Sequence, residues 1–268
     1  MPLDGRDTGV RRFSSQSAAA KLVRTRFHPP TRSKHRIQGK AEMLHSLEML
    51  QASAPCAPKI GPHSRNAELK IYTGTCGGTA LSMQRRAHDS RFATRYFVGH
   101  GLDVGGGHDS LALYVELFPL IRHVVIYDAP QGDAQKLANV DDASFDFLFS
   151  SHCLEHVRDA TEALTNWIRV IKPGGHLVIS VPDEDLYEQG VWPSTFNSDH
   201  KLTFTLSKKT SWSPVSINLF SLLSQFSDKV KPLSIITTDH AYRYQFPRFD
   251  QTQMPLSECA IEFVLKKL

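Results

Sequence analysis

Apolar runs of strand length begin near residue 101 and alternate with helical patterns up to residue 181. Short runs rich in apolar and β-branched residues predict strands at 101–104, 123–127, 145–151 and 176–181. Between them, residues 110–118 and 159–171 carry apolar side chains at helical spacing. Strands that alternate with helices in this way predict a parallel, doubly wound α/β sheet.

Two further apolar runs follow at residues 233–238 and 260–265. No helix-length crossover with clear periodicity lies between them, and a parallel connection requires one. We therefore expect these runs to form an antiparallel hairpin at the edge of the sheet.

The charge is distributed unevenly along the 268 residues. The chain carries a formal net charge of +4, but residues 1–40 hold ten basic and only two acidic residues, which leaves 21 basic and 25 acidic residues in 41–268. The main body therefore has no broad basic face for nucleic acid. We divide the chain into a basic N-terminal extension, residues 1–83, and a domain formed by residues 84–268.

The N-terminal extension and the cysteines bear on location. Residues 1–40 are rich in Arg, Ser and Thr and contain Pro29-Pro30, which predicts a disordered tail. Since no acidic residue occurs between Asp7 and Glu42, an organelle transit peptide is the alternative. No apolar run is long enough for a membrane span. The four cysteines form no C-x-x-C pair, which fits reduced thiols in the cytoplasm.

A glycine-rich turn carries the strongest chemical signal. Asp103-Val104-Gly105-Gly106-Gly107 follows a predicted strand and precedes a predicted helix, where glycine lets the backbone turn and a ligand approach closely. Asp128 ends the next strand, 25 residues after Asp103, where a carboxylate can accept hydrogen bonds from ribose hydroxyls. The sequence therefore predicts a nucleoside-containing ligand at this edge of the sheet.

Residues from about 98 to 205 resemble the S-adenosylmethionine (SAM)-dependent methyltransferases of the broad type 11 group. The matching segments are GLDVGGGHDSL, VVIYD, GDAQKL, SFDFLFSSHCLEHV, NWIRVIKPGGHLVISVPDED and FNSDH. The resemblance implies a class I, Rossmann-like sheet whose last strand is inserted antiparallel. Only four residues separate Asp128 from Asp133, too few for a helical crossover, so we expect the usual third, edge strand to be missing.

The resemblance also implies roles for individual residues. The loop residues would hold the methionine and ribose portion of SAM, Asp128 the ribose, Asp133 and Ala134 the adenine edge, and the segment after residue 149 the methyl-transfer face. The expected cofactor-binding residues are Asp103, Gly105, Gly106, Gly107, Asp128, Asp133, Ala134, Ser150 and Ser151. One position departs from the family pattern, because Asp109 replaces the third loop glycine and adds a negative charge there.

Methyl transfer from a sulfonium needs alignment of the reacting atoms and, for a hydroxyl acceptor, a general base. His152 is the first candidate for this base and His200 the second. The reaction requires no metal, and none is expected. The resemblance makes a small molecule, a lipid or a saccharide the expected acceptor.

Three other readings of the sequence compete with this one. A nicotinamide-dependent oxidoreductase would need glycine at position 110, where the chain has Ser110. Residues 152–156 spell the H-x-x-E-H of a zinc hydrolase, but they directly follow a predicted strand and the family resemblance explains them. Asp109 and the missing edge strand leave a non-catalytic SAM-fold binding module as the third alternative.

Overall fold

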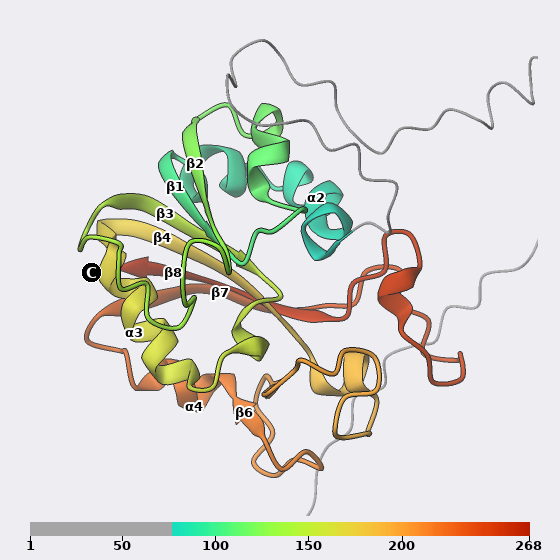
Figure 1. Cartoon of the computed structure of the whole chain (residues 1–268). Coiled ribbons are helices and arrows are strands. Elements are labelled where there is room, and N and C mark those ends of the chain that lie inside the picture. Colours follow the sequence, from blue (N-terminus) through green and yellow to red (C-terminus); the bar gives the residue numbers. More distant parts are fainter. Residues whose placement is uncertain (1–76) are drawn as a thin grey trace, which may run out of the picture. The chain divides into compact units, whose positions relative to one another are not determined.

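The computed structural model describes residues 77–268 (Figure 1). The predictions of a disordered tail or a transit peptide concern residues 1–40, which lie outside this range. Helix α2 (Gly78–His88) comes first and extends across the domain boundary predicted at residue 84. Within the described residues, no helix has the length and apolar character needed to cross a membrane.

A six-stranded sheet with the order β2-β1-β3-β4-β8-β7 forms the centre of the fold. Its strands are β1 (Gly99–Val104), β2 (Ile121–Tyr127), β3 (Phe145–Ser151), β4 (Ile171–Pro182), β7 (Val230–Thr238) and β8 (Ala260–Lys267). Strands β2, β1, β3 and β4 pair in parallel, whereas β8 is antiparallel to both β4 and β7. The predicted Rossmann-like sheet with an antiparallel C-terminal hairpin is confirmed.

Strand β2 lies at the edge of the sheet, as expected if the usual third strand is missing. Residues 128–144 form only turns. Helix α3 (Ala160–Val170) holds this segment, because Trp167 Nε1 donates a hydrogen bond to Ala134 O at 2.8 Å and Asn166 Nδ2 donates one to Gln135 O at 3.0 Å. Side chains of α3 thus position a segment that no neighbouring strand supports.

Helical elements cover both faces of the sheet (Figure 1). Helix α2, η1 (Phe92–Tyr96) and η2 (Leu111–Leu117) pack on one face, and α3 and α4 (Leu219–Ser224) pack on the other. The helix predicted at 110–118 is a 3₁₀ segment instead of an α-helix, with non-helical backbone angles at Tyr114. Shorter elements complete the fold: η3 (Leu154–His156), η4 (Glu184–Glu188), η5 (Gln251–Gln253) and the two-stranded sheet of β5 (Thr203–Thr205) and β6 (Ser216–Asn218).

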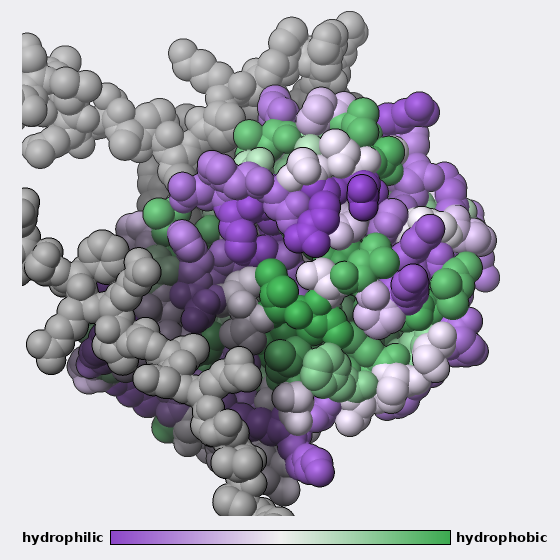
Figure 2. Space-filling view, turned by 180° about the vertical axis from the view of Figure 1, so that it is seen from behind, coloured by the Kyte–Doolittle hydropathy of each residue, from purple (hydrophilic) through white to green (hydrophobic). Residues whose placement is uncertain are grey.

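Apolar side chains are not confined to the interior. Seen from behind, the surface carries an apolar area between polar regions (Figure 2). Exposed apolar residues include Phe220 of α4 and Leu233 and Ile236 of the edge strand β7. A groove between α4 and β7 reaches Val230 and Leu268, at the amino-end side of the parallel strands. This groove is therefore at the opposite end of the sheet from the carboxyl ends, where ligands of such folds bind.

Candidate active site

The turn after β1 is built so that only glycine fits at its first position. Gly105 has a φ of +78°, and a Cβ placed there would lie 2.6 Å from Cys153 Cβ. Carbon atoms in contact normally stay about 3.5–4.0 Å apart. The backbone at Gly105 therefore lies directly against the segment that follows β3, and the two segments together form one wall of a pocket.

Asp103 lies beneath this turn and is completely buried. Its Oδ2 accepts hydrogen bonds from Ser110 Oγ at 2.6 Å and from the Leu111 backbone N–H at 2.7 Å. Burial raises the pKa of Asp103 to about 7, although these two hydrogen bonds act in the opposite direction. Asp103 thus links the start of the glycine turn to the start of η2 and does not line the pocket above it.

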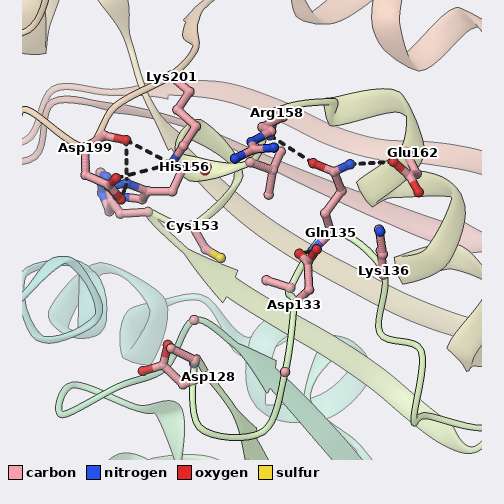
Figure 3. Close-up of a pocket in the computed structure, with 16 residues that line it drawn as sticks. Asp128, Asp133, Gln135, Lys136, Cys153, His156, Arg158, Glu162, Asp199 and Lys201 are labelled. Atoms are coloured by element: carbon pink, nitrogen blue, oxygen red, sulfur yellow. Dashed lines mark hydrogen bonds and ion pairs between the residues drawn. The ribbon is translucent and has the colours of Figure 1, made fainter.

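A pocket of about 870 Å³ opens at the carboxyl edge of the sheet (Figure 3). Its volume is within the range of roughly 300–1,000 Å³ that is usual for small-molecule sites. Of the residues predicted from the sequence, this pocket brings together Gly105, Asp128, Asp133, Ala134 and His152. Residues from four separate segments of the sequence therefore meet around one cavity.

Besides Asp103, four of the predicted cofactor-binding residues do not line this pocket. Gly106 and Gly107 continue the turn, and a Cβ on Gly107 would lie 3.1 Å from Asp128 Oδ2. Ser150 is buried and its Oγ donates a hydrogen bond to Val104 O at 2.9 Å, which joins β3 to β1. The buried Oγ of Ser151 has no hydrogen-bond partner among the described residues. In this structure, Ser150 supports the sheet instead of facing the cavity.

Sequence reasoning did not identify several residues that line the pocket, including Gln135. Its Oε1 accepts hydrogen bonds from the backbone N–H groups of Arg158 and Asp159 at 2.9 and 3.0 Å, and its Nε2 donates to Glu162 (Figure 3). Gln135 therefore connects the turn after Asp133 to the start of α3. Cys153 and His156 also line the pocket, and the H-x-x-E-H string was the signal that could have identified them.

Asp109, the departure from the family pattern, directs its charge away from the pocket. Its Oδ2 accepts the backbone N–H of Ala80 at 3.0 Å, and its Oδ1 accepts a hydrogen bond from Tyr114 at 2.9 Å. Burial raises the pKa of its carboxyl group. The side chain thus joins α2 to η2 and adds no carboxylate to the cavity wall.

A second pocket of about 350 Å³ lies next to the first. Both pockets are lined by His152 and His156, so these two histidines form the boundary between them. His200, Tyr187 and Asn197 line only the second pocket. The two histidines predicted as general bases are therefore brought to the same cavity, although 48 positions separate them in the sequence.

Three histidines surround the buried carboxylate of Glu155. Its Oε1 is 3.5 Å from His152 Nδ1 and 3.9 Å from the Nε2 atoms of His156 and His200. Burial alone would raise the pKa of Glu155, but the three histidines outweigh it and hold the pKa below the usual value. The boundary between the two pockets therefore holds one buried carboxylate with three imidazole rings around it.

Comparison with known proteins gives a family match for part of the chain. Residues 84–212 match the family model of a methyltransferase domain. Similar solved structures include a SAM-dependent methyltransferase from Archaeoglobus fulgidus, with 14% identity, a TM-score of 0.47 and coverage of 72% of this chain and 95% of that chain. Another, from Mesorhizobium loti, has 15% identity, a TM-score of 0.43 and coverage of 69% and 97%. No curated protein matches the chain.

The strand order, the glycine turn over a buried aspartate and the matching family model define a class I methyltransferase domain. The protein is a SAM-dependent methyltransferase, and its cofactor is S-adenosylmethionine. The match to residues 84–212 includes the glycine turn, Asp128, the H-x-x-E-H string and His200.

Proposed function

We propose that the 870 Å³ pocket holds SAM and that the adjoining 350 Å³ pocket holds a small-molecule acceptor. The observation that supports this division is that His152 and His156 line both pockets. A methyltransferase must bring a methyl donor and an acceptor together at one boundary. A pocket of about 350 Å³ with many polar side chains suits a small polar molecule better than a lipid chain or a long saccharide.

The residues around the larger pocket fit SAM. Gly105 leaves room where a Cβ would collide with Cys153, so a ligand can approach the backbone of the turn. Asp128 follows β2 and extends into the pocket, where its carboxylate can accept hydrogen bonds from both ribose hydroxyls (Figure 3). Asp133 and Ala134 lie on the turn held by α3 and would meet the adenine edge.

His152 acts as the general base for a hydroxyl acceptor in this proposal. Bound SAM would supply an electrophilic methyl group for transfer to the acceptor oxygen, with the neutral thioether as the leaving group. The acceptor hydroxyl gives its proton to the imidazole of His152. Glu155, with its Oε1 3.5 Å from His152 Nδ1, stabilises the imidazolium that forms.

Labelling with SAM that carries an isotopic methyl group tests the acceptor class. The purified protein is incubated with separate extracts of small metabolites, lipids and polysaccharides. We expect enzyme-dependent label in the small-metabolite fraction. Label found only in the lipid or polysaccharide fraction would contradict the assignment of the smaller pocket to a small molecule.

Asp128→Ala tests the cofactor half of the proposal. The substitution removes a carboxylate that accepts charge-assisted hydrogen bonds, each worth roughly 1.5–3 kcal/mol. We expect SAM affinity, measured by calorimetry, to fall by about tenfold to a hundredfold. Asp141→Ala is the control, since Asp141 is exposed and does not line the pocket, and its SAM affinity should equal that of the wild type. Equal affinities of the two variants would argue against a ribose contact at Asp128.

A further inference from the structure

The carboxylate of Glu155 is unusual among the buried acidic groups of this protein. The residue is 0% exposed, and neither carboxylate oxygen accepts a hydrogen bond from any described residue. A buried carboxylate without a hydrogen-bond donor carries a large desolvation cost unless a cation compensates its charge. Methyl transfer as proposed above uses His152 and does not explain why His156 and His200 also face this group.

His200 is held in the orientation that metal-binding histidines adopt. Its Nδ1 lies 2.7 Å from Glu188 Oε1, and both side chains are almost fully buried. A carboxylate only accepts hydrogen bonds, so Nδ1 carries the hydrogen and the lone pair of the neutral ring is on Nε2. That Nε2 atom faces Glu155 Oε1 at 3.9 Å.

His156 repeats the arrangement. Its Nδ1 lies 2.9 Å from Asp199 Oδ2 (Figure 3). Its Nε2 faces Glu155 Oε1 at 3.9 Å. A ligating histidine typically donates its other ring N–H to a carboxylate in this way. A proton on either Nε2 would not satisfy Glu155, because 3.9 Å is too long for a hydrogen bond. With both rings neutral, two lone pairs and an anionic oxygen therefore converge on one point.

We propose that Glu155, His156 and His200 bind a divalent transition metal ion, with zinc as the best match. Their ligand atoms all lie within 4.8 Å of one another. Ligand atoms about 2.0–2.2 Å from a tetrahedral zinc ion are roughly 3.3–3.5 Å apart. The two 3.9 Å separations from Glu155 need to shorten by about half an ångström, and the separation between the two histidine nitrogens, within 4.8 Å, by at most about 1.5 Å. This proposal replaces the expectation from the sequence that no metal binds.

The backbone already joins the two segments that carry these ligands. The N–H groups of Lys201 and Leu202 donate to Glu155 O at 2.8 and 3.1 Å, and Lys201 Nζ donates to His156 O at 2.7 Å. The ligands therefore need little rearrangement to close around an ion. The set differs from an H-x-x-E-H zinc site, because the second histidine comes from position 200 instead of position 152.

Two histidines and one glutamate leave a fourth tetrahedral position open, as in catalytic zinc sites. All three side chains line the smaller pocket beside His152, so that position is open to a water molecule or a ligand bound there. The ligand set itself rests on the distances around Glu155 and does not depend on which acceptor the pocket binds.

Metal titration of the full chain tests the proposal. After removal of bound metal with a chelator, the protein is titrated with Zn²⁺ against a chromogenic chelator and with Co²⁺, whose visible absorption reports tetrahedral nitrogen and oxygen ligation. We expect one equivalent of metal per chain. His200→Asn should weaken binding by at least about a hundredfold, and Glu188→Gln by about tenfold to a hundredfold, because Glu188 only orients His200.

The controls separate this site from other histidines and from misfolding. His123→Asn alters an exposed histidine of β2 and should bind metal as the wild type does. SAM binding shows whether the His200 and Glu188 variants are folded. If they are not, His156→Asn replaces them in the metal titration, because His156 is partly exposed and its substitution disturbs the interior less. Folded wild type that takes up less than one equivalent, or an affinity unchanged in His200→Asn or His156→Asn, overturns the proposal. SAM binding and methyl transfer by metal-free protein would leave the proposed function intact.

Discussion

Gly105→Ala should lower the affinity for SAM by at least about thirtyfold. The new Cβ would lie 2.6 Å from Cys153 Cβ and 2.7 Å from Cys153 Sγ, so either the glycine turn or the segment after β3 must move. Overpacking of this kind costs roughly 1–3 kcal/mol. The left-handed φ of +78° adds roughly 1–2 kcal/mol for a residue with a side chain. Both of these segments line the pocket, so movement of either one disturbs the cofactor site. Calorimetry with SAM measures the loss of affinity.

Gly174→Ala is the control that introduces the same backbone strain without a steric collision. Gly174 has a similar φ of +82°, but a Cβ placed there meets no atom within 4 Å. This variant should lose stability in denaturant unfolding and keep the wild-type affinity for SAM. If Gly105→Ala binds SAM as well as Gly174→Ala does, the close approach of the turn to Cys153 is not what shapes the cofactor site.

His152→Asn should slow methyl transfer by on the order of a hundredfold, which is within the usual contribution of a general base. Asparagine suits this position because His152 has a φ of +56°, a backbone conformation that asparagine tolerates better than most residues. The affinity for SAM should stay within about threefold of the wild type, since the proposed role lies on the acceptor side. Single-turnover rates and calorimetry on the same preparation measure the two quantities separately.

His240→Asn is the matched control, because His240 is exposed and lines neither pocket. It should transfer methyl groups at the wild-type rate. A His152→Asn variant that loses SAM affinity in proportion to its rate would place His152 in the cofactor site instead of at the base position.

The sequence predicted the fold because local signals and the tertiary structure agree. Residues 145–151 form a strand with the predicted bounds, since an apolar run of this length matches a buried strand and is too short for a typical helix. The spacing of Asp128 and Asp133 excluded a crossover helix, and only turns form there. The helix predicted at 110–118 was wrong in type, because Asp103 holds Ser110 and Leu111 and the segment forms a 3₁₀ turn.

The site was predicted less completely, because it depends on contacts between distant segments. The place of Ser150 in the family motif could not show that its side chain hydrogen-bonds to Val104 instead of facing the cavity. The cluster around Glu155 was also invisible in the sequence, since His200 is 45 positions away and reaches it through the connection after β4. Only the packed structure shows which of these histidines share a carboxylate.

Calorimetry with SAM, its demethylated product and NAD is the most direct test of the central claim. The glycine turn and Asp128 line one pocket, and position 110 is a serine where the nicotinamide pattern needs glycine. We predict that SAM and the demethylated product each bind the purified full chain in a 1:1 complex, and that NAD gives no signal. Binding of NAD without binding of SAM would contradict the account.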